Sequence, residues 1–178
     1  MNYSIRESVG TDWPQIWSFL EPIFRRGETY VLPRALDEEG ARVFWLDTPL
    51  RTYAALDANG MIVGSYFIRP NQPGPGAHVC NCGYAVAEVA RGAGVATQMC
   101  EHSQTEAAAL GFRAMQYNFV VSTNEGAVRL WKKLGFEIVG RLPGAFDHPR
   151  LGYVDALVMF KKLESKSCWS SKHHMLGG

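Results

Sequence analysis

The stretch over residues 86–96 constrains the fold more than any other part of the sequence. An apolar segment typical of a β-strand runs through Arg91, Gly92 and Gly94 directly into a segment with helical spacing of apolar residues. The glycines let the backbone approach a ligand closely, and the first helical turn leaves N–H groups unpaired at the positive end of the helix dipole. This junction predicts a cradle for an anion such as a pyrophosphate. It is not a known nucleotide loop, because G-x-x-x-x-G-K-[ST] is missing and G-x-G-x-x-G is incomplete.

Apolar periodicity and turn residues predict the element order β-α-α-β-β-β-α-β-α-β-β. The expected strands span residues 3–7, 51–56, 61–69, 78–87, 114–121, 136–142 and 152–161, and the expected helices span 11–24, 35–45, 95–110 and 124–134. Residues 142–151 are expected to form a loop. The order predicts a single α/β domain over residues 1–164, with a mixed sheet and about four helices, followed by a polar tail over residues 165–178.

Length and charge narrow the class of protein. The chain has 178 residues, a net charge of +1 and a pI near 7.7, so the charge balance favours neither nucleic acid nor an anionic membrane as partner. No apolar run reaches the length of a membrane span, and residues 1–7 lack the apolar centre of a signal peptide. We therefore expect a cytoplasmic protein.

The four cysteines do not suggest a disulfide framework, and reduced thiols are expected. His78, Cys80 and Cys82 share one face of an expected strand, where a metal could be imagined. No second ligand pair at zinc spacing accompanies them, and small cysteines pack readily in sheets. We expect no metal.

A second motif follows about 30 residues after the first. Asn124 is a suitable N-cap residue, apolar residues with helical spacing follow it, and Gly135 ends the segment. Together, R-x-x-G-x-A at residues 91–96 and N-x-x-A-x-x-L-W-x-x-x-G-F at residues 124–136 resemble the GNAT superfamily of acetyl-CoA-dependent N-acetyltransferases. The resemblance covers residues 50–162 by motif order.

The resemblance implies a GNAT-like fold in which the fourth and fifth strands splay apart and hold the pantetheine arm of acetyl-CoA. Residues 91–97 would hold the pyrophosphate, Val86 would bond near the acetyl carbonyl, and Asn124 would contact the pantetheine. The implied cofactor-binding residues are Val86, Arg91, Gly92, Ala93, Gly94, Val95, Ala96, Thr97, Asn124, Ala127 and Trp131.

Two residues depart from the common GNAT pattern. Glu88 stands where proline is frequent, and Trp131 stands where a tyrosine usually protonates the departing sulfur. An indole N–H can donate a hydrogen bond but cannot serve as that acid. A thiol with a pKa of ~8.5 is a tolerable leaving group as thiolate, so Trp131 either shapes the acetyl pocket or is an ordinary core residue.

The acceptor amine needs to lose a proton, and the central strands offer amides rather than carboxylates. Asn81 and Asn118 lie on the two strands expected to splay, both in apolar surroundings. Either they orient the acceptor amine, or they are structural amides that bond across the sheet. Glu88 is the carboxylate candidate for a base acting through water. Asp147 and His148 could form an acid-base pair, but Asp-His-Pro is more typical of a turn.

A narrower resemblance concerns the acceptor. C-N-C-G-Y at residues 80–84 and G-A-F-D-H-P at residues 144–149 are similar to small-molecule GNATs that acetylate L-azetidine-2-carboxylate and related imino acids. Phosphinothricin and amino acid acetyltransferases are more distant, and similar proteins are often homodimers. The resemblance implies that Asn81 and Asn118 contact the substrate. The aromatic residues Tyr30, Phe67 and Tyr84 could enclose a small acceptor, whereas an open groove would favour a peptide. A protein or peptide N-acetyltransferase, or a non-catalytic acyl-CoA sensor, remain alternatives.

Overall fold

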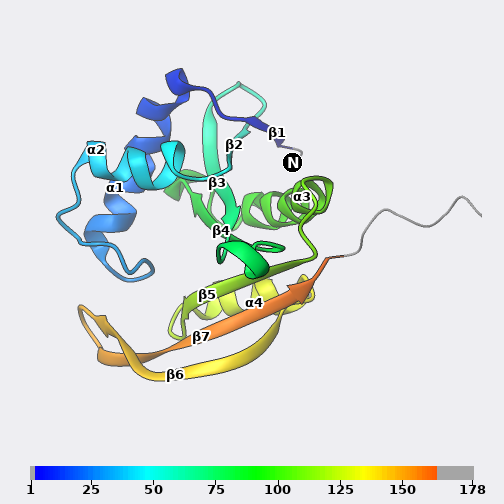
Figure 1. The fold of residues 1–178 in the computed structure, drawn as a ribbon. Helices are drawn as coiled ribbons and strands as arrows, with labels where there is room; N and C mark the ends of the chain where they lie inside the picture. Colours follow the sequence, from blue (N-terminus) through cyan, green and yellow to red (C-terminus); the bar gives the residue numbers. More distant parts are fainter. Residues whose placement is uncertain (1–2, 164–178) are drawn as a thin grey trace, which may run out of the picture.

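A computed structural model describes residues 3–163, so the tail expected over residues 165–178 lies outside the described part of the chain. The described chain forms one seven-stranded sheet in the order β1-β2-β3-β4-β5-β7-β6, in which β4 and β5 are the parallel neighbours (Figure 1). The strands are β1 (Ser4–Glu7), β2 (Arg51–Leu56), β3 (Ile62–Pro70), β4 (Val79–Val86), β5 (Ala114–Val121), β6 (Glu137–His148) and β7 (Gly152–Lys162). The predicted mixed α/β sheet is confirmed.

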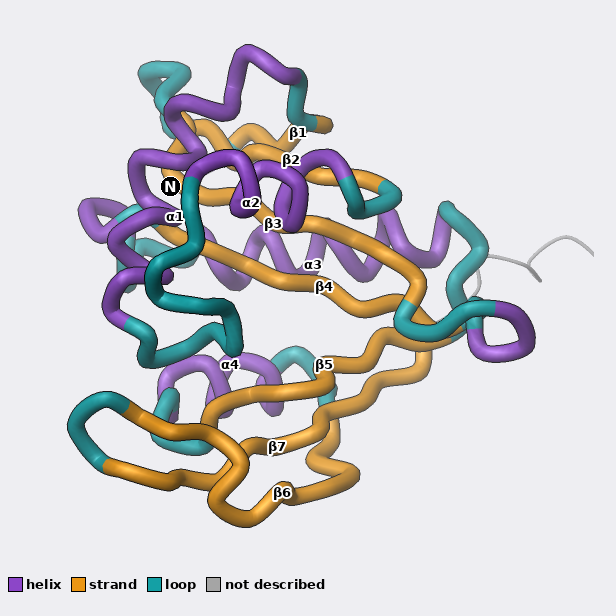
Figure 2. The backbone as a smooth tube through the Cα atoms, turned by 60° about the vertical axis from the view of Figure 1, so that its left-hand side comes forward, coloured by secondary structure: helices purple, strands orange, loops and turns teal. Residues whose placement is uncertain are grey.

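The helices cover both faces of this sheet, as Figure 2 shows. They are α1 (Trp13–Arg26), α2 (Glu38–Arg42), α3 (Val95–Ala109) and α4 (Glu125–Lys133). Helix α1 places Ile16, Leu20 and Ile23 on one face, where they pack with α2 against the sheet. Helices α3 and α4 pack on the opposite face through residues such as Met99 and Trp131. A ligand between β4 and β5 would therefore be reached from both layers.

The sheet opens between β4 and β5. These strands pair only through Val79 with Ala114 and Cys80 with Met115, and beyond that point they diverge (Figure 2). On its other side β5 stays paired with β7, with a bulge at residues 118–119, because Tyr117 pairs with Met159 and Val120 with Leu157. A bulge bends its strand and increases the local twist. The predicted splay between the fourth and fifth strands is confirmed.

Two expected elements differ from the structure. The second helix begins at Glu38 rather than 35, because the side chain of Asp37 accepts a hydrogen bond from the Gly40 N–H at 2.8 Å and caps it. It continues into a π-helical turn over Val43–Asp47.

The expected loop over residues 142–151 is wrong, because β6 continues to His148 across a register shift. Gly144 takes a φ of 59° there, which a residue without Cβ adopts at little cost. The Asp155 carboxylate of β7 accepts hydrogen bonds from the Gly144 N–H at 2.9 Å and from Arg141 at 2.6 Å. These contacts hold the irregular strand to its neighbour.

None of the helices within residues 3–163 is long and apolar enough to cross a lipid bilayer.

Candidate active site

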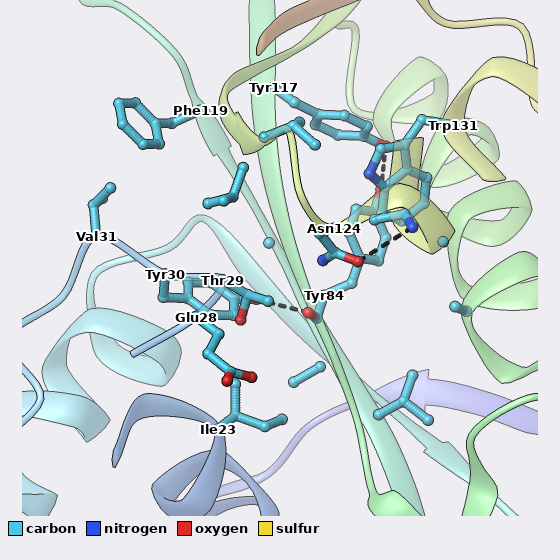
Figure 3. A pocket seen from close by; sticks show the side chains of 18 of the residues that line it. Ile23, Glu28, Thr29, Tyr30, Val31, Tyr84, Tyr117, Phe119, Asn124 and Trp131 are labelled. Carbon is cyan, nitrogen blue, oxygen red and sulfur yellow. Dashed lines mark hydrogen bonds between the residues drawn. The ribbon is translucent and has the colours of Figure 1, made fainter. Parts of the chain in front are cut away.

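A cavity of about 880 Å³ occupies the opening between β4 and β5. Figure 3 looks into it: Glu28, Thr29 and Tyr30 approach from the loop after α1, Asn124 from the N-cap of α4 and Trp131 from its last turn. The turn between β6 and β7 closes a further side with His148, Arg150 and Leu151. Segments that are distant in sequence thus enclose one site beside the glycine-containing junction.

The junction before α3 has the geometry of an anion cradle. Gly92 and Gly94 have φ values of 75° and 87°, in the left-handed region that favours glycine. A Cβ at either position would meet no atom within 4 Å, so open space lies in front of the backbone. Gly94 is the N-cap of α3 and offers no side-chain cap. The first N–H groups of α3 therefore have no intrahelical or cap acceptor and could hold an anion.

Some of the residues expected to bind the cofactor line the cavity, and others do not. The members that line the cavity are Val86, Arg91, Gly92, Ala96, Asn124, Ala127 and Trp131. Ala93, Gly94 and Thr97 lie outside the lining. Val95 is 1% exposed, and a Cβ on Gly64 would come within 2.9 Å of its side chain. The Val95 side chain is therefore committed to the core, and its N–H is the group that could reach a ligand.

The open side of β4 presents main-chain groups to the cavity. The Ala87 N–H donates to the Val63 carbonyl of β3 at 2.8 Å. Since alternate residues of a strand direct their polar groups to opposite sides, Tyr84 and Val86 direct theirs toward the opening. The Tyr84 carbonyl accepts a hydrogen bond from the Tyr30 hydroxyl at 2.6 Å, and burial raises the pKa of Tyr30. The Val86 N–H is positioned to meet a ligand carbonyl.

The Tyr84 side chain lies on the α3 side of the sheet. Its ring centroid is 5.0 Å from that of Trp131, and its hydroxyl bonds to Ser103 at 2.7 Å and to the Tyr117 hydroxyl at 3.0 Å. Burial raises the pKa of both tyrosines well above the ordinary value, so both phenols are neutral near pH 7. At Tyr84, predicted to contact the acceptor, the main chain faces the opening while the ring belongs to the core.

Trp131 combines core packing with a place in the cavity wall. It is 8% exposed and packs against both Tyr84 and Tyr117, which also contact each other. Its indole N–H has no hydrogen-bond partner within residues 3–163. The Asn124 side chain, by contrast, caps α4 by accepting from the Ala127 N–H at 3.3 Å. The sequence correctly predicted Asn124 as the N-cap residue of α4.

Asn81 and Asn118 both line the cavity but differ in their surroundings. Asn81 is 8% exposed, and its amide donates to the Gln116 carbonyl at 2.9 Å, one residue beyond the last paired residue of β4. Its Oδ1 has no partner within the described residues. Asn118 is exposed at the bulge of β5, where it bonds to Gln116 at 2.9 Å and to Asn71 at 2.6 Å. The expectation that Asn118 lies in apolar surroundings is wrong, since the bulge places it in a polar group.

The carboxylate that lines the cavity is not the one that the sequence predicts. Glu88 follows β4 in a 3-10 turn, its side chain is 80% exposed, and it lies 4.0 Å from Arg26 outside the cavity lining. Glu28 lines the cavity instead, and its carboxylate is 2.6 Å from Arg150. No role was predicted for Glu28 from the sequence.

His148 is buried at the end of β6 and lines the cavity. Its Nδ1 accepts a hydrogen bond from the Arg150 N–H at 3.2 Å. A neutral ring with that bond carries its proton on Nε2 and faces other groups as a donor rather than a base. The bond fixes the turn at Pro149 and Arg150, whereas Asp147 and His148 themselves lie at the end of β6 rather than in a loop.

The wall on the α1 side is aromatic. Phe67 is 2% exposed and lines the cavity, as expected for an acceptor site. A Cβ on Gly83 would lie 2.5 Å from the Phe67 ring, so the ring lies across this glycine. Arg69, which sequence reasoning missed, extends over the same ring.

Within residues 3–163, no group of three His, Cys, Asp or Glu side chains is arranged to hold a metal.

A sheet that opens beside a helix N-terminal anion cradle, with one cavity running through the opening, defines an acyltransferase domain. A profile of the Acetyltransferase (GNAT) family matches residues 13–136. The chain belongs to this family.

Known proteins support the assignment. The N-acetyltransferase aca1 of Schizosaccharomyces pombe is 33% identical over 109 residues, which cover 59% of this chain and 51% of that protein. The chain thus spans about half the length of this curated relative. A GCN5-related N-acetyltransferase from Kribbella flavida has 44% identity and a TM-score of 0.86, over 90% of this chain and 98% of that one.

More distant structures share the fold. A phosphinothricin acetyltransferase from Sinorhizobium meliloti, solved with acetyl-CoA, has 20% identity and a TM-score of 0.82, over 92% of this chain and 89% of that one. A ribosomal-protein-alanine N-acetyltransferase from Brucella melitensis has 23% identity and a TM-score of 0.79, over 90% of this chain and 99% of that one. Proteins with different named substrates therefore share this architecture.

Proposed function

We propose that this protein transfers the acetyl group of acetyl-CoA to the amine of a small amino or imino acid, such as the proline analogue L-azetidine-2-carboxylate. The observation that carries the proposal is the continuity of one cavity from the cradle to an aromatic wall. The cradle end suits a pyrophosphate, and the wall formed by Tyr30 and Phe67 suits a compact acceptor.

The residues present fit acetyl-CoA. Open space in front of Gly92 and Gly94 leaves room for a pyrophosphate against the first N–H groups of α3, with Arg91 beside it. Val86 directs its N–H into the opening, where a pantetheine arm would run. When bound there, acetyl-CoA supplies a thioester carbonyl within reach of the acceptor amine.

The chain's own groups perform three tasks in this reaction. The Val86 N–H stabilises the negative charge that develops on the carbonyl oxygen. Asn81 and Asn118 orient the acceptor so that its nitrogen lone pair faces the carbonyl carbon. The unpaired indole N–H of Trp131 can donate a hydrogen bond to sulfur, without supplying a proton.

The reaction needs no covalent enzyme intermediate. The amine nitrogen forms a bond to the carbonyl carbon, the carbon–sulfur bond breaks, and the thiolate leaves with the electron pair. The acceptor ammonium loses one proton to water or to a carboxylate before the attack, and the nitrogen loses a second proton as the amide forms, which can protonate the thiolate to give free CoA. Glu88 is exposed, so it would have to act through water.

The cavity also bears on the alternatives. The contact between Glu28 and Arg150 joins the loop after α1 to the β6–β7 turn beside the acceptor end, which favours a small acceptor over an extended peptide. The replacement of tyrosine by Trp131 is the sole support for a non-catalytic sensor. A cytoplasmic location and a homodimer remain predictions.

The test is release of free thiol from acetyl-CoA with a panel of amines, amino acids and imino acids. We expect turnover with at least one imino or amino acid. Turnover with peptides alone would favour the peptide N-acetyltransferase. No thiol release with any member of the panel, with acetyl-CoA binding verified by calorimetry, would favour the sensor.

A further inference from the structure

Arg69 is a charged side chain in the cavity wall without a charged partner. It is partly buried at the end of β3, and its guanidinium carbon lies 5.3 Å from the Phe44 ring centroid and 5.2 Å from that of Phe67. Within residues 3–163, no carboxylate pairs with it and no carbonyl accepts from it. Two aromatic faces hold the guanidinium in place and leave its N–H groups unused.

Each of the other arginines that line the cavity has an anionic partner in the protein or in the proposed complex. Arg26 lies 4.0 Å from Glu88, and Arg150 lies 2.6 Å from Glu28. Arg91 begins the cradle, where a pyrophosphate supplies its counter-charge in the proposed complex. Arg69 is thus the cavity-lining arginine, among the described residues, for which neither the protein nor the proposed cofactor provides an anion.

The position of Arg69 excludes the pyrophosphate as its partner. Arg69 is paired with Asn81 across β3 and β4, whereas the cradle follows the far end of β4. At a rise of roughly 3.3 Å per residue, the five residues from Asn81 to Val86 alone span about 16 Å. The guanidinium lies over Phe67, whose ring covers Gly83, so it faces the acceptor end of the cavity.

A partly desolvated cation without a protein acceptor gains free energy when an anion meets it. Burial lowers the pKa of the Arg69 guanidinium, but arginine stays protonated in proteins. The charge therefore persists in the free enzyme, and a ligand carboxylate would satisfy it. The planar fork of a guanidinium matches a carboxylate with two parallel hydrogen bonds.

We propose that Arg69 binds the carboxylate of the acceptor, so that the enzyme selects amines that carry a carboxylate next to the nitrogen. This proposal rests on the proposed acetyltransferase function. The neighbouring Asn81 has a free Oδ1, which can accept an N–H of the same acceptor. In an α-amino or α-imino acid the nitrogen and the carboxylate are separated by one carbon. Arg69 and Asn81 would hold these two groups and direct the nitrogen toward the thioester.

The experiment compares two acceptors that differ only in charge: L-azetidine-2-carboxylate and its carboxamide. Thiol release with saturating acetyl-CoA gives kcat/KM for each. The wild-type enzyme should prefer the acid by about a hundredfold. Arg69→Gln should lower kcat/KM for the acid by about the same factor and leave that for the amide nearly unchanged. Arg69→Lys keeps the charge but loses the fork and should fall between the two.

Arg26→Gln is the matched control, because it removes a cavity-lining arginine that already has a carboxylate partner. It should preserve the preference for the acid. Affinity for CoA should be the same in all variants, since the cradle is untouched. An Arg69→Gln enzyme that keeps the full preference for acid over amide would overturn the proposal while leaving the acetyltransferase function intact.

A binding measurement tests the same point without turnover. Calorimetry with L-azetidine-2-carboxylate in the presence of CoA should show weaker binding to Arg69→Gln than to the wild type, and equal binding to Arg26→Gln. Equal affinities for the wild type and Arg69→Gln would refute carboxylate recognition. Arginine-dependent binding without thiol release would instead support the recognition of the acid and contradict the proposed catalysis.

Discussion

The carboxylate of Glu28 lies 2.6 Å from the guanidinium of Arg150, and this ion pair joins the loop after α1 to the turn between β6 and β7. Both residues line the cavity. The Glu28 side chain is 28% exposed and that of Arg150 is 74% exposed. The pair therefore sits at the rim, where solvent weakens it, and we interpret it as a closure over the acceptor rather than a source of stability.

Glu28→Gln should lower kcat/KM for the acceptor by up to about fivefold, in line with the ~1 kcal/mol that exposed ion pairs reach. Arg150→Gln should do the same, and the double variant should be no worse than either single variant, because both remove one contact. Steady-state kinetics over all three variants measures the coupling. A hundredfold fall in kcat for Glu28→Gln alone would show that Glu28 takes the proton from the acceptor.

Gly94→Val should weaken CoA binding by tenfold or more, about 1.4 kcal/mol, because a side chain would fill the open space in front of the cradle. Gly111→Val is a matched control: Gly111 has a φ of 91°, also has open space around its Cβ position, and lies at the opposite end of α3. Both variants carry similar backbone strain, so both should be destabilised. Calorimetry should show lost CoA affinity for Gly94→Val only, and equal affinities in both folded variants would count against the cradle.

Trp131→Phe should retain kcat within about tenfold, because a hydrogen bond to sulfur is lost but no proton donor is removed. The smaller ring leaves a gap where Trp131 packs against Tyr84 and Tyr117, so the melting temperature should fall. Activity is therefore compared per folded molecule, with thermal melts beside the kinetics. A loss of three orders of magnitude in kcat, with CoA affinity unchanged, would show that Trp131 has an essential chemical role.

Asn118→Ala should lower kcat/KM for the acceptor by roughly 10²-fold through lost alignment, with little change in stability because Asn118 is exposed. Asn71→Ala is the control, since it removes the partner of Asn118 without altering the cavity lining. It should have a much smaller effect on kcat/KM. Amine saturation kinetics separates the two variants, and an Asn118→Ala enzyme with full activity would remove Asn118 from the site.

Asn81→Ala should affect both stability and activity. It leaves the part-buried Gln116 carbonyl without its donor, at a cost of about 1 kcal/mol in the free energy of unfolding. It also removes the Oδ1 that the acceptor would use, so kcat/KM should fall by roughly 10²-fold. Denaturant unfolding and kinetics on one preparation measure both effects. A destabilised variant with full activity per folded molecule would assign Asn81 a purely structural role.

The parts of the fold with strong local signals could be predicted from the sequence. The strand 114–121, the helix capped by Asn124 and the cradle glycines were identified because caps, left-handed glycines and apolar periodicity are local properties. The extension of β6 could not be predicted, because it depends on contacts of Asp155 from another strand. Pro143 and Gly144 locally favour a turn.

The acceptor side of the site shows the same limit. In the sequence, Arg69 is only a polar residue at the end of an expected strand. Its proposed role depends on its contacts with Phe44 and Phe67, which the sequence does not show. Asn118 was identified as a site residue, but its exposure follows from a bulge that strand periodicity does not encode. Glu88 was favoured as the base by its place in the motif, whereas its orientation toward solvent is set by the 3-10 turn that begins there.

Beyond Cys80, the side of β4 that faces β5 has no strand paired with it, although β4 lies in the middle of the sheet. An ordinary edge invites another chain to pair with it, but here helices cover both faces, and only a slender chain can reach the unpaired groups. The pantetheine arm would act as the missing strand. Amide hydrogens of Tyr84 and Val86 should therefore exchange rapidly in the free enzyme and slow down when CoA binds, while those of Ala85 and Ala87, which face β3, stay protected throughout.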